Sequence, residues 1–452
     1  MSAQTVINTL ADTARAAGRT LSTATGAQRK AALQTIADAI EARSVEILDA
    51  NAKDMEAGRS AGLNSSLLDR LLLTPERVQG IAGGARQVSE LPDPLGITLR
   101  QSTLPNGIKL EQISVPFGVI GMVYEARPNV TVDAAVILLM SGNAALLRGS
   151  SSAAHSNEVL VRVMRDALAT TSISPDVIQL VPSEDRETVK ALLNARGKVD
   201  LVIPRGSAAL IRMVVDESSV PTIETGAGVC HVYIDEFADL SKAVPIIINS
   251  KVQRPSVCNA AETLLVHSAV AEGFMPIALK ALHEAGVVLH CDTRALAIAN
   301  KAGIPANQAT DENFCTEYGT LEMNVAVVDS VDAASAHIAK YGTQHTEAII
   351  SENKDVVKRF IALADCAAVM VNTSTRFTDG EQMGFGAEIG ISNQKLHARG
   401  PMGLEAMTTT KQHRVRRAGY AFVRELAEQG CSLRFDVATV LGTQLTVYED
   451  AF

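Results

Sequence analysis

The first hundred residues carry a helical alternation of apolar and polar positions. Between Ala27 and Met55, apolar side chains recur at steps of three and four residues, with charged residues between them. This spacing gives a helix one apolar face, so it predicts two or three helices that pack on a core by one side. The segment 91–107 then holds three prolines and two glycines, which predicts a hairpin and a change of structural unit near residue 100.

From Ile113 onward, short runs rich in Val, Ile and Leu end in Gly or Pro and alternate with helical patterns. This rhythm is typical of βαβ units, in which helices cover both faces of a parallel sheet. It predicts one α/β domain before Gly226 and a second over about 227–375. The predicted strands are 118–124, 143–149, 177–182, 199–206, 230–235, 262–267, 287–292, 324–330, 346–352 and 367–372.

The part after Asn372 is rich in Gly and Thr and has few apolar runs long enough for a core of its own. It is therefore expected to wrap over other domains or partners. Near the end of the chain, GYAFVRELAEQG predicts a helix and QLTVYE a strand.

Composition narrows the class of protein. The 452 residues are 47% hydrophobic and 4% aromatic, with a formal net charge of −9. Negative charge and few aromatic side chains disfavour nucleic acid as a partner. No apolar run approaches the roughly 20 residues that cross a bilayer, and the N-terminus lacks the pattern of a signal or transit peptide. These features predict a cytoplasmic protein of two or three domains with no membrane segment.

Several common site motifs are missing. The six cysteines lie far apart, with no CxxC pair and no Cys/His cluster at metal-ligand spacing, so neither a disulfide framework nor a metal site is predicted. Neither GxGxxG nor GxxxxGKS/T occurs, which leaves no standard nucleotide signature. The near match GFGAEIG at 384–390 is interpreted as glycines that let the backbone pass close to another segment, in preference to a cradle for phosphate.

Cys258 is the best candidate for covalent chemistry. It follows a loop marked by Pro255, has Lys251 and Arg254 nearby, and precedes a strand-like run. Cations lower the pKa of a thiol and populate the nucleophilic thiolate. On context alone, an inert small hydrophobic residue is the more common role of such a cysteine.

Other polar residues near the predicted turns leave two interpretations open. Asn129 follows Pro128 at a strand-to-helix turn, where it is either an N-cap, which context favours, or a donor to an oxyanion. Glu224 precedes a glycine-containing turn and is either a solvated residue or a poised carboxylate. His345 and His397 lie in polar loops, where surface histidines are expected.

Seven segments carry a family resemblance. In the same order, from about residue 10 to about residue 415, they resemble the gamma-glutamyl phosphate reductases (glutamate-5-semialdehyde dehydrogenases), a family within the aldehyde dehydrogenase superfamily. The segments are VPFGVIGMVYEARPNVTVDAA, SGNAALLRGSSSA, DLVIPRGSAALIRMV, VPTIETGAGVCHVYID, QRPSVCNAAETLLVH, NTSTRFTDGEQMGFGAEIGIS and QKLHARGPMGLEAMTT.

The resemblance implies an aldehyde dehydrogenase-like α/β fold with two Rossmann-like parallel-sheet domains plus an oligomerisation flap. An NADPH-binding domain is expected over 1–98 and 115–226, and a catalytic domain over 227–375. The flap and a C-terminal tail take 99–114 and 395–452. Members of the superfamily hold the dinucleotide without GxGxxG, which accounts for the missing motif.

It also implies a reaction: the NADPH-dependent reduction of L-glutamyl 5-phosphate to L-glutamate 5-semialdehyde with release of phosphate, a step of proline biosynthesis. Cys258 is then the nucleophile that forms a thioester, and the amide of Asn129 is an oxyanion donor. Glu224 takes the position of the base that activates water in hydrolytic aldehyde dehydrogenases. A reductase has no use for that water, so Glu224 is expected to turn away, or to serve proton transfer or nicotinamide positioning.

The cofactor implied is NADPH. Arg148-Gly149-Ser150-Ser151 replaces the Lys-Pro-x-Glu of aldehyde dehydrogenases, whose Glu disfavours a 2′-phosphate. A neutral Ser beside an Arg removes that repulsion and supplies donors, which favours NADPH over NADH. Amides at a helix start are expected along the pyrophosphate. The expected cofactor residues are Arg148, Gly149, Ser150 and Ser151 in this stretch, Gly206 and Ser207 along the pyrophosphate, and Glu322 at the nicotinamide ribose.

Substrate contacts and partners are less defined. A homo-oligomer, dimer or tetramer, is expected, together with a transient contact with glutamate kinase. A kinase fused ahead of residue 100 is not expected, and the tail 420–452 is expected to brace the oligomer.

Two alternatives stay open: a hydrolytic NAD(P)-dependent semialdehyde dehydrogenase with Glu224 as base, and a non-catalytic binding protein on the same fold. Candidates for the substrate's amino and carboxylate groups are Glu125, Arg127, Lys395, His397 and Arg399.

Overall fold

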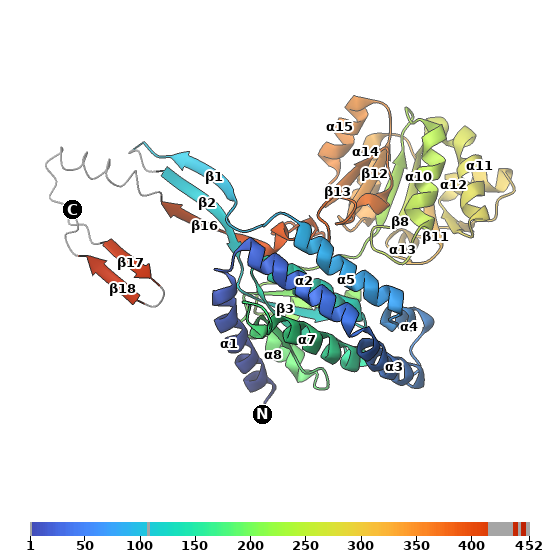
Figure 1. Cartoon of the computed structure of the whole chain (residues 1–452). Helices are drawn as coiled ribbons and strands as arrows, with labels where there is room; N and C mark the ends of the chain where they lie inside the picture. The colour runs from blue at the N-terminus through green and yellow to red at the C-terminus, as the bar shows by residue number, and fades with distance from the viewer. Residues whose placement is uncertain (1, 106–108, 415–436, 442–443, 449–452) are drawn as a thin grey trace. The chain divides into compact units, whose positions relative to one another are not determined.

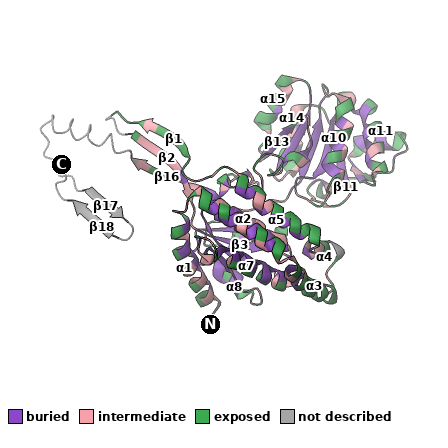
Figure 2. Cartoon of the chain, viewed as in Figure 1, coloured by how far each residue is buried: buried purple, intermediate pink, exposed green. Residues whose placement is uncertain are grey.

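The computed structural model describes residues 2–105, 109–414, 437–441 and 444–448. The chain divides into two compact units: Met1–Asp93 with Phe117–Met407, and Pro94–Pro116 with Thr408–Phe452. The first unit carries two parallel sheets with helices around them (Figure 1). Its sheet strands are largely buried, whereas the outer faces of its helices are exposed (Figure 2). The predicted α/β class with parallel sheets is confirmed.

Five helices open the first unit, and side chains cap most of their N-termini. Ser2, Asn64 and Thr74 each accept a hydrogen bond from a backbone N–H of the first turn, and Thr25 forms a capping box with Gln28. Such caps satisfy N–H groups that have no partner within the helix. The two or three helices predicted from the spacing over 27–55 are confirmed as α2 and α3, whereas the other three helices were not predicted individually. The helices are α1 (Ala3–Leu21), α2 (Gly26–Ala42), α3 (Ser44–Ser60), α4 (Ser65–Leu71) and α5 (Pro75–Glu90).

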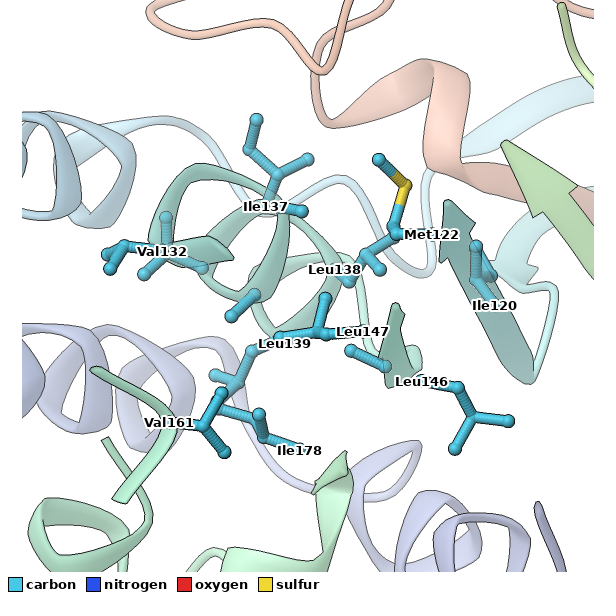
Figure 3. Packing of buried hydrophobic residues seen from close by; sticks show 14 of the residues in the cluster. Ile120, Met122, Val132, Ile137, Leu138, Leu139, Leu146, Leu147, Val161 and Ile178 are labelled. Atoms are coloured by element: carbon cyan, nitrogen blue, oxygen red, sulfur yellow. The ribbon is translucent and has the colours of Figure 1, made fainter. Parts of the chain in front are cut away.

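A four-stranded parallel sheet in the order β5-β4-β3-β6 follows these helices. Helix α6 is apolar on nearly every side, and its residues Ile137, Leu138 and Leu139 share one core with the strand residues Ile120 and Leu147 (Figure 3). This core buries the helix against the sheet. The strands are β3 (Val119–Tyr124), β4 (Ala144–Arg148), β5 (Ile178–Leu180) and β6 (Leu201–Arg205). The helices are α6 (Pro128–Met140), η1 (Ser151–Ala153), α7 (Ala154–Leu168), η2 (Pro175–Val177), α8 (Glu187–Leu193) and α9 (Ala208–Glu217).

A second sheet has seven parallel strands in the order β10-β9-β11-β8-β7-β12-β13. Separate apolar clusters form its core. The strands are β7 (Cys230–Ile234), β8 (Ala261–His267), β9 (Val288–Cys291), β10 (Asn307–Gln308), β11 (Glu322–Val328), β12 (Thr346–Ile350) and β13 (Ala368–Val371). The helices are α10 (Leu240–Val252), α11 (Ser268–Glu284), α12 (Thr293–Lys301), α13 (Asp311–Phe314), α14 (Val331–Tyr341) and α15 (Lys354–Leu363).

The polar stretch after Asn372 packs over the first unit, as expected. Met402 and Met407 enter the core around the four-stranded sheet. A Cβ on Gly390 would lie 2.5 Å from Thr225 Cγ2, so the interpretation of the 384–390 glycines as a device for close approach is confirmed at this position. The short elements of this stretch are η3 (Thr375–Phe377), β14 (Ile391–Ser392), β15 (Gly400–Pro401) and η4 (Glu405–Met407).

The second unit contains a three-stranded antiparallel sheet in the order β1-β2-β16 and a β17–β18 hairpin. The hairpin predicted near residue 100 is confirmed as β1–β2, and β18 covers most of the predicted strand QLTVYE. The predicted helix GYAFVRELAEQG lies outside the described residues. Residues 395–407, which the sequence assigned to the flap, belong to the first unit. The strands are β1 (Thr98–Thr103), β2 (Lys109–Pro116), β16 (Thr408–Arg414), β17 (Val437–Leu441) and β18 (Gln444–Tyr448).

Within the described ranges, no helix combines the length and the apolar character needed to span a membrane.

Candidate active site

Cys258 lies in the loop between α10 and β8, and its side chain is partly exposed. Its backbone is held tightly. The Sγ of Cys230 donates a hydrogen bond to the Cys258 carbonyl oxygen at 3.2 Å. Gly228 approaches the same oxygen so closely that a Cβ on residue 228 would lie 1.5 Å from it. The loop therefore fixes Cys258 through its main chain.

The thiol of Cys258 is protonated at neutral pH. Burial raises its pKa to about 11, and the nearby Arg205 guanidinium opposes this shift. The expected lowering of the pKa by Lys251 is wrong, because Lys251 Nζ is buried against Glu262 Oε2 at 2.5 Å. Arg205, the last residue of β6, is the cation that favours the thiolate.

Asn129 lies inside the first turn of α6, because the N-cap position is taken by Arg127. The N-cap interpretation of Asn129 is therefore wrong. Its Nδ2 donates instead to Asp133 Oδ2, one turn further along, at 2.9 Å. Burial raises the pKa of Asp133 to about 6, and the hydrogen bond from Asn129 opposes that shift. This bond fixes the orientation of the Asn129 amide and leaves its second N–H available to another acceptor.

A cavity of about 660 Å³ opens beside Asn129. Its lining includes Arg127, together with Arg254, Ser256 and Val257 of the loop that leads into Cys258. The cavity thus brings the Asn129 amide and the candidate nucleophile's loop to the same space.

The side chain of Glu125 lies against the start of α9, where the pyrophosphate segment was predicted. Its carboxylate accepts hydrogen bonds from the Ser207 N–H at 2.8 Å and the Ser207 hydroxyl at 2.6 Å. A Cβ on Gly206 would lie 2.7 Å from the Glu125 carboxyl carbon. Helix N-termini bind anions through backbone N–H groups, and here a carboxylate of the chain itself occupies that place. Glu125 does not line the cavity beside Asn129.

The stretch that follows β4 turns sharply into η1. Arg148 is buried, and its guanidinium donates to the carbonyl oxygens of Gly149 at 2.9 Å and Ser183 at 3.3 Å. Ser150 caps η1 through a bond from the Ser152 N–H, and Ser151 is exposed. Arg148 therefore organises this turn, and the exposed hydroxyl is that of Ser151.

Glu224 lines a second cavity, of about 360 Å³, which also borders Arg212 of α9 and Asn393. The Glu224 backbone N–H donates to Gln394 Oε1 at 3.2 Å. Glu224 is not among the residues that line the cavity beside Asn129.

Glu322 begins β11 and is partly exposed. Its carboxylate lies 3.1 Å from His290 Nε2 and accepts a bond from the Thr320 hydroxyl at 3.0 Å. These two hydrogen bonds, with His290 the larger cause, lower the pKa of Glu322. The carboxylate is therefore ionised and suited to accept hydrogen bonds from hydroxyl groups.

The predicted substrate residues after position 394 form a cluster of their own. Lys395 and Arg399 both pair with Asp365, at 2.6 Å and 2.9 Å. His397 is exposed, as expected, and its Nε2 lies 2.8 Å from the Ala406 carbonyl oxygen. None of the three candidates lines either cavity.

The surface position expected for His345 is wrong. The side chain is fully buried, and its Nδ1 lies 2.9 Å from Thr346 Oγ1. Burial, with a smaller effect from Arg205, lowers the pKa of His345 to about 4. This histidine is neutral at physiological pH.

Sequence reasoning missed three charged residues near the candidate site. Arg205 ends a predicted strand, and the carboxyl end of a parallel strand is where sites gather. Asp133 is the lone acid in the apolar run of α6. Glu388, in the glycine-rich segment, has a pKa that burial raises to about 7 against the opposing effect of Arg205. The sequence shows each residue at its place in a predicted element, but it does not show that the three lie near one site.

The described cysteines are free thiols, and no group of three or more His, Cys, Asp or Glu among the described residues is placed to hold a metal ion.

Comparisons with known proteins agree with this geometry. The family model described as "Aldehyde dehydrogenase family" matches residues 1–304. A gamma-glutamyl phosphate reductase of Thermobifida fusca is 55% identical over 405 residues, which is 90% of this chain and 96% of the relative. One from Kineococcus radiotolerans is 55% identical over 397 residues, 88% of this chain and 92% of the relative. The chain belongs to the gamma-glutamyl phosphate reductases of the aldehyde dehydrogenase family.

A solved gamma-glutamyl phosphate reductase, from Thermotoga maritima, has the same fold. It superimposes with a TM-score of 0.87 at 42% identity and covers 90% of this chain and 98% of the solved one. The predicted aldehyde dehydrogenase-like fold is therefore confirmed.

An aldehyde dehydrogenase family member uses a nicotinamide cofactor, and the described residues fit one beside α9. The helix start already binds a carboxylate through the Ser207 N–H, which shows that this end of the helix accepts anionic oxygens. The adjacent cavity of about 360 Å³ is bordered by Arg212, whose guanidinium has no ion pair within the described part of the chain. The start of α9 therefore carries a backbone N–H, which Glu125 now binds, and the cation of Arg212 lies on the same helix.

Proposed function

We propose that this chain reduces L-glutamyl 5-phosphate to L-glutamate 5-semialdehyde with NADPH and releases phosphate, a step of proline biosynthesis. The near full-length similarity to gamma-glutamyl phosphate reductases supports the reaction. The observation that carries it is the shared cavity: Asn129 and the loop of Cys258 line one space. Acyl transfer requires a thiol nucleophile and an amide donor close to one acyl carbon; the cavity is lined by Asn129 and by Val257, the residue that precedes Cys258.

In the proposed mechanism, Cys258 Sγ attacks the acyl carbon as a thiolate. The bond from that carbon to the phosphate oxygen breaks, its electron pair leaves with inorganic phosphate, and a thioester forms. When bound, NADPH supplies the hydride that reduces the thioester carbon. The carbon–sulfur bond then breaks, which returns the Cys258 thiolate and frees the aldehyde.

The attack by Cys258 and the later reduction of the thioester each pass through a tetrahedral species. In both, the former carbonyl oxygen carries negative charge. The Asn129 Nδ2 group, held by Asp133, has a second N–H to donate to this oxygen. The backbone N–H of Cys258 is the other proposed donor. Removal of one such donor typically slows an enzyme by about 10² to 10³.

The cofactor proposed is NADPH. Arg148 holds the turn after β4 through carbonyl oxygens; Gly149, Ser150 and the exposed Ser151 are proposed to face the 2′-phosphate with hydroxyl donors and without the Glu that aldehyde dehydrogenases place there. Gly206 and Ser207 are proposed along the pyrophosphate, where Glu125 must give way to it. The ionised Glu322 is proposed to accept hydrogen bonds from the nicotinamide ribose.

Glu224 is proposed to position the nicotinamide or to transfer a proton. Its cavity borders α9, and it lies outside the lining of the cavity beside Asn129. The position of Glu224 beside α9, where the pyrophosphate is proposed to bind, supports this role.

The reverse reaction tests the function. Enzyme, L-glutamate 5-semialdehyde and NADP⁺ are expected to give NADPH only when phosphate or arsenate is added. Equal rates without either anion would establish the hydrolytic alternative. Cys258→Ser is expected to abolish turnover. If the Cys258→Ser protein keeps its full biological role, the non-catalytic alternative is established.

A homo-oligomer is proposed, with the second unit at the contact. The contact with glutamate kinase and the cytoplasmic location stay predictions.

A further inference from the structure

Three arginines project into the cavity beside Asn129 without acidic partners. Arg70, Arg127 and Arg254 all line it. Across the described ranges, none of their guanidinium groups forms an ion pair or a side-chain hydrogen bond. Most other arginines of the first unit do form such pairs, as Arg77 of the same cavity does with Asp69 at 2.8 Å.

The three carboxylates that line the cavity do not form ion pairs with these arginines in the described part of the chain. Asp69 is bound by Arg77, and Asp133 accepts the hydrogen bond of Asn129. Glu381 is exposed at the surface. No carboxylate among the described residues therefore pairs directly with any of the three arginines, and arginines outnumber acids in the lining of the cavity.

Uncompensated charge in a partly buried space is unfavourable. Burial, together with repulsion from Arg205, Arg70 and Arg254, lowers the pKa of Arg127 to about 10. A fold tolerates such repulsion where an anionic ligand relieves it, because each guanidinium then gains a charge-assisted hydrogen bond.

We propose that Arg127 and Arg254, with Arg70 behind them, hold the phosphate group of the acyl phosphate and, in the reverse direction, free inorganic phosphate. This proposal rests on the proposed function. Arg127 stands two residues before Asn129, and Arg254 stands in the loop that carries Cys258, so both flank the acyl carbon to which the phosphate is bonded.

Charge favours phosphate over the amino-acid end of the substrate. A phosphate group carries about two negative charges near neutral pH, which matches a pair of guanidinium forks. The amino-acid end carries one carboxylate and one ammonium, and an all-arginine site would repel the ammonium. The arginines therefore hold the leaving group in place and neutralise the charge that it gains as the carbon–oxygen bond breaks.

The test measures the reverse reaction with inorganic phosphate as the varied substrate. Arg254→Gln and Arg127→Gln are expected to raise the KM for phosphate at least tenfold and to change the KM for the semialdehyde less than twofold. Arg254→Lys, which keeps the charge and loses the fork, should fall between. Arg359→Gln, at an exposed arginine paired with Asp332, is the matched control and should behave as wild type.

Two results would overturn the proposal. One is an unchanged KM for phosphate in both Gln variants. The other is a raised KM for the semialdehyde alone, which would assign the arginines to the amino-acid end. Calorimetric titration of inorganic phosphate into the Cys258→Ser protein, with and without Arg254→Gln, measures the same site without turnover. If the wild-type enzyme oxidises the semialdehyde without phosphate, the proposed function is wrong. The titration still shows in that case whether the arginines bind phosphate.

Discussion

At the scale of single residues, the charge state of Cys258 depends on groups far from it in the sequence. Burial raises its pKa to about 11, and Arg205 is the main group that opposes the shift. Below that pKa, the thiolate is the minor form, and its fraction grows about tenfold with each pH unit. Thiol reactivity should therefore report on Arg205 directly.

We expect Arg205→Leu to slow the alkylation of Cys258 by iodoacetamide about tenfold at pH 8, since loss of a nearby cation raises the pKa of the thiol by about one unit. The wild-type rate should rise without a plateau between about pH 7 and 9. Peptide mass spectrometry at Cys258 measures it. Arg205→Lys keeps the charge and should react nearly as wild type. Equal rates for Arg205→Leu and wild type would remove Arg205 from the site's electrostatics.

Asp133 is expected to position Asn129. Asp133→Leu removes the acceptor of the 2.9 Å bond and frees the Asn129 amide to rotate, so kcat should fall about 10- to 100-fold while the KM for NADPH stays constant. Asp133→Asn retains an acceptor oxygen and should keep most of the activity. Steady-state kinetics with circular dichroism separates this loss from misfolding. A Leu variant with full kcat would show that the amide needs no such anchor.

The sequence allowed Cys258 and Asn129 to be singled out, because their types and their places at predicted turns match the chemistry. Arg205 and Asp133 were not identifiable in the same way. The effect of Arg205 on Cys258 arises only when the end of β6 and the loop after α10 meet. The role of Asp133 depends on where α6 begins, since an acid four residues after Asn129 lies beside it only when both residues are within the helix.

At the scale of elements, the start of β7 and the loop of Cys258 are pressed together. The contact is between main chains, and a Cβ on Gly228 would lie 1.5 Å from the Cys258 oxygen and 2.8 Å from its Cα. Only glycine leaves room for this approach. The position of the nucleophile is therefore determined by an element that precedes it by a whole helix.

Gly228→Ala is expected to displace the Cys258 loop and reduce kcat at least 100-fold, because small misplacements of reacting groups are costly. Gly273→Ala is the matched control. Gly273 lies within α11, and a Cβ there meets nothing within 4 Å, so this change should keep activity and stabilise the helix by up to about 1 kcal/mol. Kinetics and thermal unfolding measure both. An active Gly228→Ala enzyme would mean that the loop position is not critical.

The strands were predictable because parallel strands are continuous apolar runs. Two features of the fold were not predicted. Strand β10 has two residues, too few for a pattern. Helix α6 begins at Pro128, a residue that fits the first position of a helix, and not after Asn129 as the N-cap interpretation required. That start moves the N-cap to Arg127 and places Asn129 within the helix.

At the scale of the whole molecule, the second unit exposes apolar side chains that a monomer would leave in water. Ile97, Leu99 and Leu104 are 40%, 56% and 37% exposed and lie on or beside β1. β1 is also an edge strand of its sheet, with backbone groups open to further pairing. Exposed apolar side chains on an edge strand are typical of a surface that is covered by another chain.

Leu99→Glu should therefore lower the oligomeric state, because an ionised carboxylate in an apolar contact costs several kcal/mol to bury. Ile361→Glu places the same charge on α15, where Ile361 is 49% exposed, and it should leave the assembly intact. Sedimentation velocity at several concentrations distinguishes the species, and circular dichroism shows whether each variant is folded. If the Leu99 variant sediments as wild type, the contact between copies lies elsewhere. If both variants dissociate, added charge and not the surface of β1 is responsible, and the second unit loses its proposed role.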